Sequence, residues 1–167
     1  MLMNPVFADY LQAYGESGLK AQRLGHLEAL ARLYWYTVEF GLIATPEGLR
    51  IYGSGILSSA GESVYCLDDP RPHRLHFELR RVMRTRYRID RYQQTYFVIN
   101  DFAELFAATR PDFAPIYREI AALPPLAADA VLPGETDHPQ LPKRRAAPEC
   151  GPSLGRKRLE DVRQNHK

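Results

Sequence analysis

The spacing of apolar residues in segment 27–42 constrains the fold more than any other feature of this sequence. Leucine, valine and aromatic side chains recur there at intervals of three and four residues, which is the repeat of one face of an α-helix. The second half of the segment, LYWYTVEFGL at 33–42, is apolar on nearly every side. The sequence therefore predicts a helix that starts at the surface, enters a hydrophobic core and stops near Gly41.

Glu39 is the one carboxylate on the apolar stripe of this helix. Because an ionised carboxylate is costly to bury without a partner, something is expected to hold it. One interpretation is a structural carboxylate satisfied by an arginine or by backbone donors. The other is an oxygen ligand for a metal, since iron(II) sites for oxygen chemistry commonly combine two histidines with one carboxylate. Composition does not choose between them.

The composition is that of an ordinary globular protein. Of 167 residues, 45% are hydrophobic and 25% are charged, which predicts one domain. No apolar run approaches the roughly 20 residues that span a bilayer, and the first residues lack a secretory leader, so we predict a cytoplasmic protein without a membrane segment. Cys66 and Cys150 are far apart and are predicted to be free thiols.

The charge of the chain is unevenly distributed. The net charge is +2, but segment 143–167 holds eight Lys or Arg against three Asp or Glu, a net of +5, which leaves −3 for residues 1–142. A strongly basic body, which nucleic-acid binding would favour, is therefore absent.

Patterns and turn residues predict a mainly α-helical fold with short β-strands. The first part of the chain is expected to form a short helix and loop in 5–24 interrupted by Gly15 and Gly18, the helix at 27–42 with a Glu28–Arg32 pair, a turn at 45–48 and a strand at 49–57. A helix through Cys66 follows, started by a capping box of Ser59 and Glu62, and then a break at 68–72 and a helix at 77–84. The last predicted elements are a strand at 94–99 and a helix at 101–109, which is capped by Asn100 and closed by Pro111. Residues 1–123 are predicted to form the domain and residues 124–167, rich in Pro and charge, a disordered or loosely packed tail.

Three separated motifs resemble one known family. LYWYTVEFGL, YGSGILSSAGESVYCL at 52–67 and QTYFVINDF at 94–102 are similar to the C-terminal half of the catalytic domain of the biopterin-dependent aromatic amino acid hydroxylases, most closely the bacterial phenylalanine 4-monooxygenases. The resemblance covers roughly residues 2–123. It implies a helical domain that uses Fe(2+), a tetrahydropterin cosubstrate and dioxygen to convert L-phenylalanine into L-tyrosine in phenylalanine catabolism.

The resemblance also implies roles for particular residues. Glu39 corresponds to the carboxylate ligand of the iron, and no residue of this chain is assigned as a catalytic acid or base. The other implied positions are substrate-binding Trp35, Phe40, Gly55, Ser58 and Glu62, and pterin-binding Ala31 and Tyr34.

The sequence departs from the family at the metal. The family's two histidine ligands stand five residues apart just upstream of the stretch that resembles LMNPVFADY, which here begins at Leu2, and none of the five histidines of this chain forms such a pair. His73 and His76 share a face if they lie on a helix, but the matching family segment supplies no ligand. We therefore expect a truncated chain with little or no activity. The complete protein is expected to be a monomer, whereas the truncated chain is expected to self-associate through exposed core residues.

Two alternatives from other classes stay open at this point. The first is a non-catalytic interaction fragment, with an apolar patch exposed around Tyr34 and Trp35. The second, less favoured, is nucleic-acid binding through the arginines of segment 80–91 and the basic tail, although a solvated arginine-rich surface is the commoner explanation.

Overall fold

The computed structural model describes residues 5–138 of the chain. Its elements, in chain order, are α1 (Pro5–Leu24), α2 (Leu27–Tyr34), the π-helical turn η1 (Trp35–Glu39), β1 (Leu42–Thr45), β2 (Gly48–Ile51), α3 (Ser54–Leu57), α4 (Ala60–Asp68), β3 (His73–His76), α5 (Leu79–Arg84), β4 (Thr95–Ile99), α6 (Phe102–Thr109) and α7 (Phe113–Ala121).

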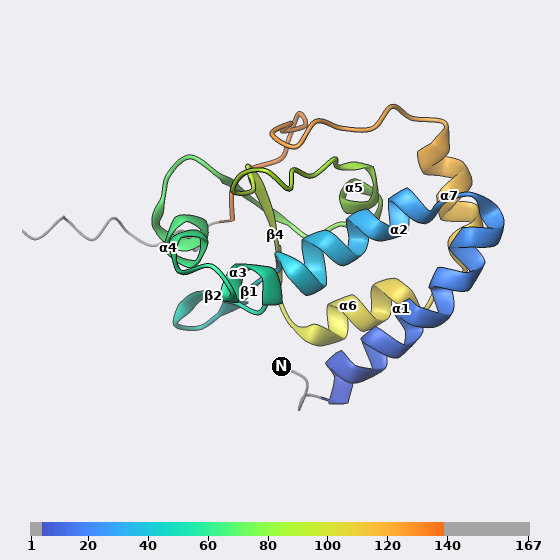
Figure 1. The fold of residues 1–167 in the computed structure, drawn as a ribbon, viewed down its shortest axis with the longest axis horizontal. Coiled ribbons are helices and arrows are strands. Elements are labelled where there is room, and N and C mark those ends of the chain that lie inside the picture. The colour runs from blue at the N-terminus through green and yellow to red at the C-terminus, as the bar shows by residue number, and fades with distance from the viewer. Residues whose placement is uncertain (1–4, 139–167) are drawn as a thin grey trace, which may run out of the picture.

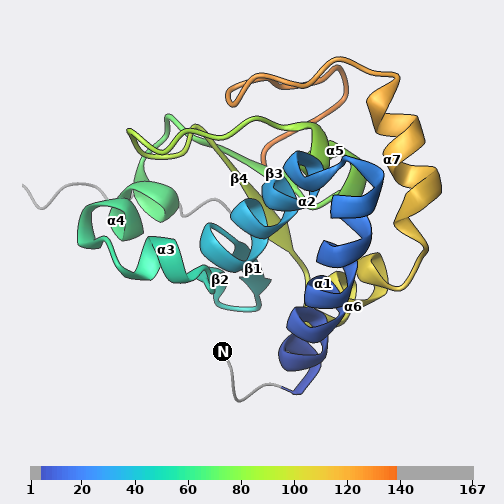
Figure 2. The same ribbon diagram turned by 45° about the vertical axis from the view of Figure 1, so that its right-hand side comes forward.

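A small mixed sheet lies between two groups of helices. Its strand order is β2-β1-β4-β3, in which β1 and β2 form an antiparallel hairpin while β4 runs parallel to both β1 and β3. Helices α1, α2, α6 and α7 gather in one half of the molecule, and α3 and α4 lie at the other end (Figure 1, and Figure 2 after a turn of the view). The predicted class, mainly α with short strands, is confirmed.

Two hydrophobic clusters fill the interior. The larger cluster is built mainly from the helices, with contributions from β3 and β4. Its buried members include Phe7, Leu30, Tyr36, Phe97 and Tyr117. The smaller packs β1, β2 and β4 against α3 and α4 through Phe40, Leu42, Leu49, Ile56, Cys66, Tyr96 and Val98. Every residue of β4 is buried, as expected for a strand with parallel neighbours on both sides.

Helix α1 is continuous, so the predicted interruption at Gly15 and Gly18 is wrong. Each glycine in a helix costs about 1 kcal/mol relative to alanine, but α1 buries Phe7 and Tyr10 against the body. The Tyr10 hydroxyl shares a hydrogen bond of 2.7 Å with the hydroxyl of Thr37, and Tyr14 donates one to the carbonyl of Leu30. Tertiary packing therefore offsets the poor local propensity.

The strand predictions were partly right. The strand at 94–99 is confirmed as β4, but the stretch expected as one strand at 49–57 divides into the end of β2 and the helix α3. Strands β1 and β3 were not predicted, because each has only four residues and no alternating pattern. The turn at 45–48 is confirmed, and Gly48 supplies the positive φ of 113° that closes the hairpin.

The helix starts show which side chains act as caps. Ser59 caps α4 by accepting the backbone N–H of Glu62, as predicted. The predicted cap of α6 was one residue off, because Asp101 and not Asn100 accepts the N–H of Glu104. The pair Glu28–Arg32 forms at 2.8 Å, as predicted. Helix α7, capped by Asp112, was not predicted.

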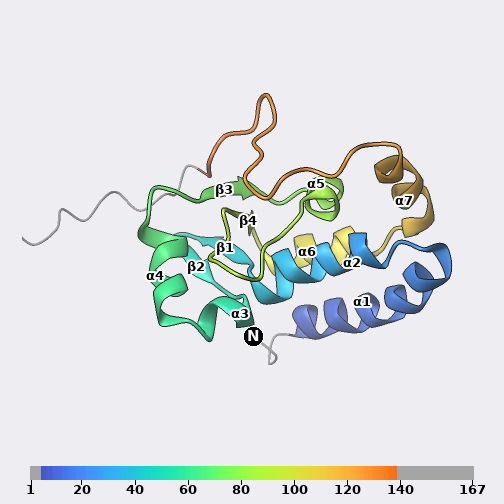
Figure 3. The ribbon, with the colours of Figure 1, turned by 45° about the horizontal axis from the view of Figure 1, so that its top comes forward.

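Residues 124–138 lie along the body as an extended strap. Figures 1 and 3 show this segment returning from the end of α7 toward β3. It is held by hydrogen bonds of Leu126 with the backbone at 84 and 86, by Glu135 on Arg81 at 2.7 Å, and by His138, whose N–H donates to the carbonyl of Arg74 at 2.7 Å. The loose packing expected after Leu123 is therefore wrong for 124–138, because the buried side chain of Arg81 takes its acceptors from this segment and the backbone of the body pairs with it. The predicted tail from 139 lies outside the described residues.

None of the helices within residues 5–138 is long and apolar enough to cross a bilayer.

Candidate functional site

The helix predicted at 27–42 changes its geometry where the site begins. Helix α2 ends at Tyr34, and the chain continues as one π-helical turn in which the N–H of Phe40 donates to the carbonyl of Trp35 at 2.8 Å. Such turns close i→i+5 hydrogen bonds and are frequent at functional sites. The hydroxyl of Ser54 donates to the carbonyl of Val38 at 3.2 Å, which ties the turn to α3.

The π-helical turn brings Tyr34 and Glu39 together. In an α-helix, residues five apart point in different directions, but an i→i+5 turn places them on the same side. Burial, together with a hydrogen bond to the Glu39 carboxylate, raises the pKa of Tyr34 above its ordinary value. The hydroxyl of Tyr34 therefore lies beside the Glu39 carboxylate.

Glu39 is half-buried and has no cation beside it. Among residues 5–138, no Lys, Arg or His forms an ion pair with this carboxylate. The arginine that one interpretation of the sequence allowed is therefore not found in the described part of the chain. A half-exposed carboxylate held by one phenol retains free lone pairs for a further ligand.

Gly55 of α3 lies close to the carboxylate of Glu39. A Cβ placed on Gly55 would lie 2.9 Å from Oε2 of Glu39 and 3.0 Å from Cζ of Phe40, which is too close for a real side chain. The chain at α3 therefore approaches Glu39 so closely that a larger residue at position 55 would displace the carboxylate. Ser58 is exposed, and its hydroxyl donates to the carbonyl of Gly55 at 2.7 Å, so it holds the end of this helix.

A row of aromatic rings stands beside Glu39. The ring of Trp35 stacks on Phe40, with centroids 4.7 Å apart, and on Tyr87, with centroids 4.2 Å apart and an interplanar angle of 13°. The sequence predicted Trp35 and Phe40 as neighbours in one pocket, and the structure brings them together. Tyr87 was missed as a member of the row, because its position in an arginine-rich segment carries no periodic signal.

Glu62 is the buried carboxylate of this region, and its side chain does not form the predicted capping box. Only 6% of Glu62 is exposed. Its Oε1 accepts the backbone N–H of Gln93 at 3.1 Å and the hydroxyl of Tyr96 at 2.8 Å. The carboxylate turns inward because those two buried donors have no other acceptor, whereas the backbone N–H of Ser59 already donates to Ile56.

Ala31 lines a surface cleft of about 480 Å³ on the α2 side of the aromatic row. The cleft is bounded by Glu28, Ala31, Arg32, Arg86, Tyr87 and Pro125. Since Tyr87 also stacks on Trp35, this cleft adjoins the aromatic row.

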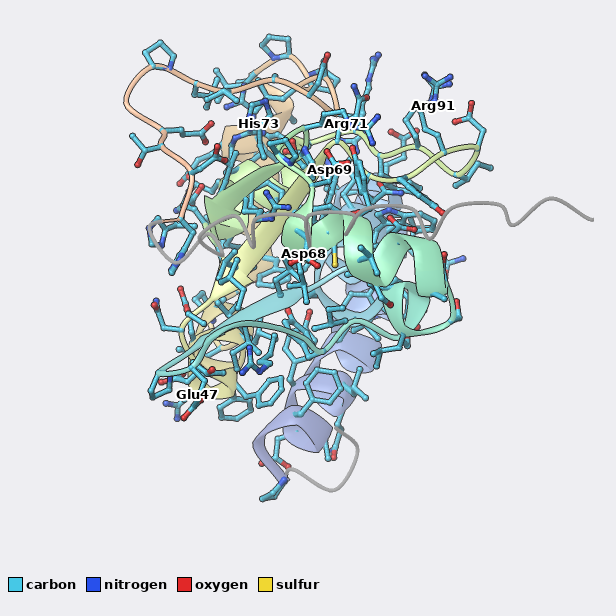
Figure 4. The ribbon with its side chains drawn as sticks, turned by 90° about the vertical axis from the view of Figure 1, so that its left-hand side faces the viewer. Glu47, Asp68, Asp69, Arg71, His73 and Arg91 are labelled. Atoms are coloured by element: carbon cyan, nitrogen blue, oxygen red, sulfur yellow. The ribbon has the colours of Figure 1, made fainter. Side chains whose placement is uncertain are left out.

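The histidines of the described chain do not complete a metal centre. His73 and His76 lie on the edge strand β3 and not on a helix, so a separation of three places them on opposite faces. His73 faces Asp137 at 3.7 Å, and the ring of His76 packs on that of His138 at 4.6 Å. Figure 4 shows His73 beside Asp69 and Arg71 where α4 leads into β3, with Glu47 far away. Within residues 5–138, no group of three or more His, Cys, Asp or Glu is arranged to hold a metal.

Most arginines of segment 80–91 are paired with carboxylates. Arg80 contacts Glu119, Arg81 contacts Glu135, and Arg88 and Arg91 both contact Asp90. These pairs offset part of the positive charge on which nucleic-acid binding would depend.

Comparison with known protein families agrees with this architecture. Residues 1–121 match the family described as biopterin-dependent aromatic amino acid hydroxylase, and the chain belongs to that family. Within it, the chain is 64% identical over 135 residues to the phenylalanine-4-hydroxylase of Ralstonia nicotianae and 62% identical over 135 residues to that of Chromobacterium violaceum. These matches cover 81% of this chain but 43% and 46% of those two proteins, so the chain spans less than half the length of these relatives.

The fold also matches solved structures of the C. violaceum enzyme. A crystal structure of the C. violaceum phenylalanine hydroxylase bound to iron and phenylalanine superposes with a TM-score of 0.79 at 62% identity, covering 80% of this chain and 50% of that one. A cobalt-bound structure of the same enzyme gives a TM-score of 0.80 at 61% identity, covering 82% and 50%.

Proposed function

We propose that this chain supplies the carboxylate and the aromatic wall of a phenylalanine 4-monooxygenase active site. The observation that carries the proposal is the position of Glu39, which ends a π-helical turn, accepts a hydrogen bond from Tyr34 and lies against Gly55 beside the aromatic row. The relatives named phenylalanine-4-hydroxylase support the choice of substrate.

The roles of the chain's own residues follow from their chemistry. Glu39 would offer carboxylate oxygen to iron(II), with Tyr34 fixing its orientation. Trp35 and Phe40 would present an apolar surface to the ring of phenylalanine, and Ala31 with Tyr34 would border the tetrahydropterin. When bound, the iron and the reduced pterin supply the dioxygen chemistry that transfers one oxygen atom to the ring.

The described residues fit one part of such an iron site and not the whole of it. They provide one oxygen ligand, and iron(II) sites of this kind also require imidazoles. We infer that this chain by itself binds iron(II) weakly and forms little or no tyrosine, and that a working protein draws its remaining ligands from elsewhere. A cytoplasmic location remains our prediction.

A hybrid enzyme tests the proposal. In the C. violaceum phenylalanine hydroxylase, the 135 residues that match this chain would be replaced by those of this chain. We expect the hybrid enzyme to form tyrosine from phenylalanine with added iron(II) and tetrahydropterin, whereas this chain alone forms little or none. A hybrid enzyme that folds and retains iron but makes no tyrosine would contradict the proposal.

A second candidate function is association through an apolar surface. The predicted patch around Tyr34 and Trp35 is only partly exposed, because both side chains are half-buried. Large apolar side chains are exposed elsewhere, on α3, on α4 and in the loop between α5 and β4: Leu57, Val64, Ile89 and Tyr92. Light scattering of this chain across a concentration series tests the candidate. A monomer at all concentrations would count against it.

A further inference from the structure

Gln93 is a buried amide that lies behind the aromatic row. It is 2% exposed, and both polar atoms of its side chain are hydrogen-bonded. Its Oε1 accepts the indole N–H of Trp35 at 3.1 Å, and its Nε2 donates to the carbonyl of Arg88 at 2.8 Å. Neither the family resemblance nor the sequence pattern singled out this residue.

The backbone of Gln93 is fixed by a second buried group. Its N–H donates to Oε1 of Glu62, which also accepts the hydroxyl of Tyr96 in the central strand β4. Glu62 therefore joins Gln93 to the most buried strand of the sheet.

Two kinds of contact together fix the indole of Trp35. Stacking on Phe40 and Tyr87 sets the plane of the ring, but stacked rings can slide and turn within that plane. The hydrogen bond to Gln93 removes this freedom, because it gives the N–H one direction. The wall beside Glu39 is thus set before any ligand arrives, which lowers the cost of ordering it on binding.

We propose that Gln93 is a positioning residue for the aromatic amino acid: it fixes the indole of Trp35, and Glu62 fixes Gln93. The identity of the substrate in this inference rests on the proposed function. The structural half of the inference, that Gln93 fixes the indole of Trp35, can be tested in this chain without any substrate. Gln93 acts through Trp35 and does not touch the substrate.

The structural half is tested by NMR of this chain. Trp35 is the only tryptophan in the sequence, so the chain gives a single indole N–H signal. Gln93→Met keeps the size of the side chain but removes the acceptor. We expect that signal to move and to exchange with solvent about tenfold faster, since one hydrogen bond is lost. The matched control, Gln94→Met, changes the next residue in the same way and should leave the signal in place. An unmoved signal in Gln93→Met would overturn the proposal.

The functional half is tested in the hybrid enzyme. We expect Gln93→Met to raise the KM for phenylalanine about tenfold while iron content and kcat stay within about twofold. On a Trp35→Phe background the same substitution should add nothing further, because its effect passes through the indole. An unchanged KM in Gln93→Met, or a full additional effect without Trp35, would overturn the positioning role. If the unsubstituted hybrid enzyme forms no tyrosine, the proposed function fails, whereas the indole signal still decides whether Gln93 holds Trp35.

Discussion

Oε2 of Glu39 lies so close to Gly55 that a single added methyl group would stand 2.9 Å from it. The two residues come from different elements, the π-helical turn η1 and helix α3, and the missing side chain of Gly55 leaves room for the carboxylate in its present position. The orientation of Glu39 is thus set by the backbone of a neighbouring helix as well as by the hydroxyl of Tyr34.

The first prediction concerns Gly55→Ala in the hybrid enzyme. The new Cβ meets Glu39 and Phe40, so the carboxylate must move, and iron(II) affinity should fall by at least about tenfold. Iron titration followed by dialysis measures this. Gly15→Ala is the matched control: it has nothing within 4 Å, should leave iron binding unchanged and should stabilise α1 by up to about 1 kcal/mol. Equal iron affinity in both variants would show that Gly55 does not shape the site.

A second prediction concerns the hydroxyl of Tyr34. Tyr34→Phe retains the ring and removes the hydrogen bond to Glu39. Because groups that orient a metal ligand typically contribute about 10- to 100-fold to affinity, iron(II) should bind at least about tenfold more weakly in the hybrid enzyme. Tyr14→Phe removes a phenol that donates to the carbonyl of Leu30 and should leave iron affinity unaltered. Iron affinity that survives Tyr34→Phe would rule out the orienting role.

Glu62 is predicted to contribute far more to stability than a helix cap does. In Glu62→Ala the buried N–H of Gln93 and the hydroxyl of Tyr96 lose their acceptor, which should cost about 2–4 kcal/mol of unfolding free energy. Ser59→Ala removes only the cap of α4 and should cost about 1 kcal/mol. Urea unfolding of this chain measures both. Equal losses would mean that Glu62 serves the cap alone.

The strap at residues 124–138 should weaken at low pH. Burial, and next the neighbouring His76, lower the pKa of His138 below its ordinary value of 6.5. The unfolded chain therefore binds a proton at His138 more readily than the folded chain does. Its stabilising contribution is complete above pH 6.5 and is lost as the pH falls through the lower folded-state pKa. Urea unfolding between about pH 8 and 5 should show a smaller loss of stability in His138→Asn than in the parent chain. Identical slopes would exclude His138 as a contributor.

Sequence patterns predicted the parts of the fold that long periodic segments specify. The helix containing Tyr34 and Trp35 and the strand at 94–99 follow repeats that burial imposes, and the motifs around Glu39 indicated the family. The π-helical turn escaped prediction, because one residue added to a helical turn leaves the apolar pattern almost intact. The contacts of Gln93 and Tyr87 depend on chain segments that meet only after folding.

Short edge elements were the least predictable. Strand β3 is four residues long, and it is held in place by β4 on one side and by Asp137 and His138 of the strap near its start. The strap in turn has a Pro-rich composition typical of disorder. It is ordered by the buried guanidinium of Arg81, which takes acceptors from Glu135 and Ala130, and by the backbone of Arg74, which pairs with Asp137 and His138. Such dependence between distant segments carries no local sequence signal.

The most direct test of the account is the iron content of the hybrid enzyme with and without the Glu39 carboxylate. We predict that Glu39→Ala lowers bound iron(II) to well below one per chain and abolishes tyrosine formation, since a ligand is lost. Glu47→Ala, which removes an exposed carboxylate from the β1–β2 turn, should keep both at the level of the parent. One iron per chain and undiminished tyrosine formation in Glu39→Ala would contradict the central claim that this residue holds the metal.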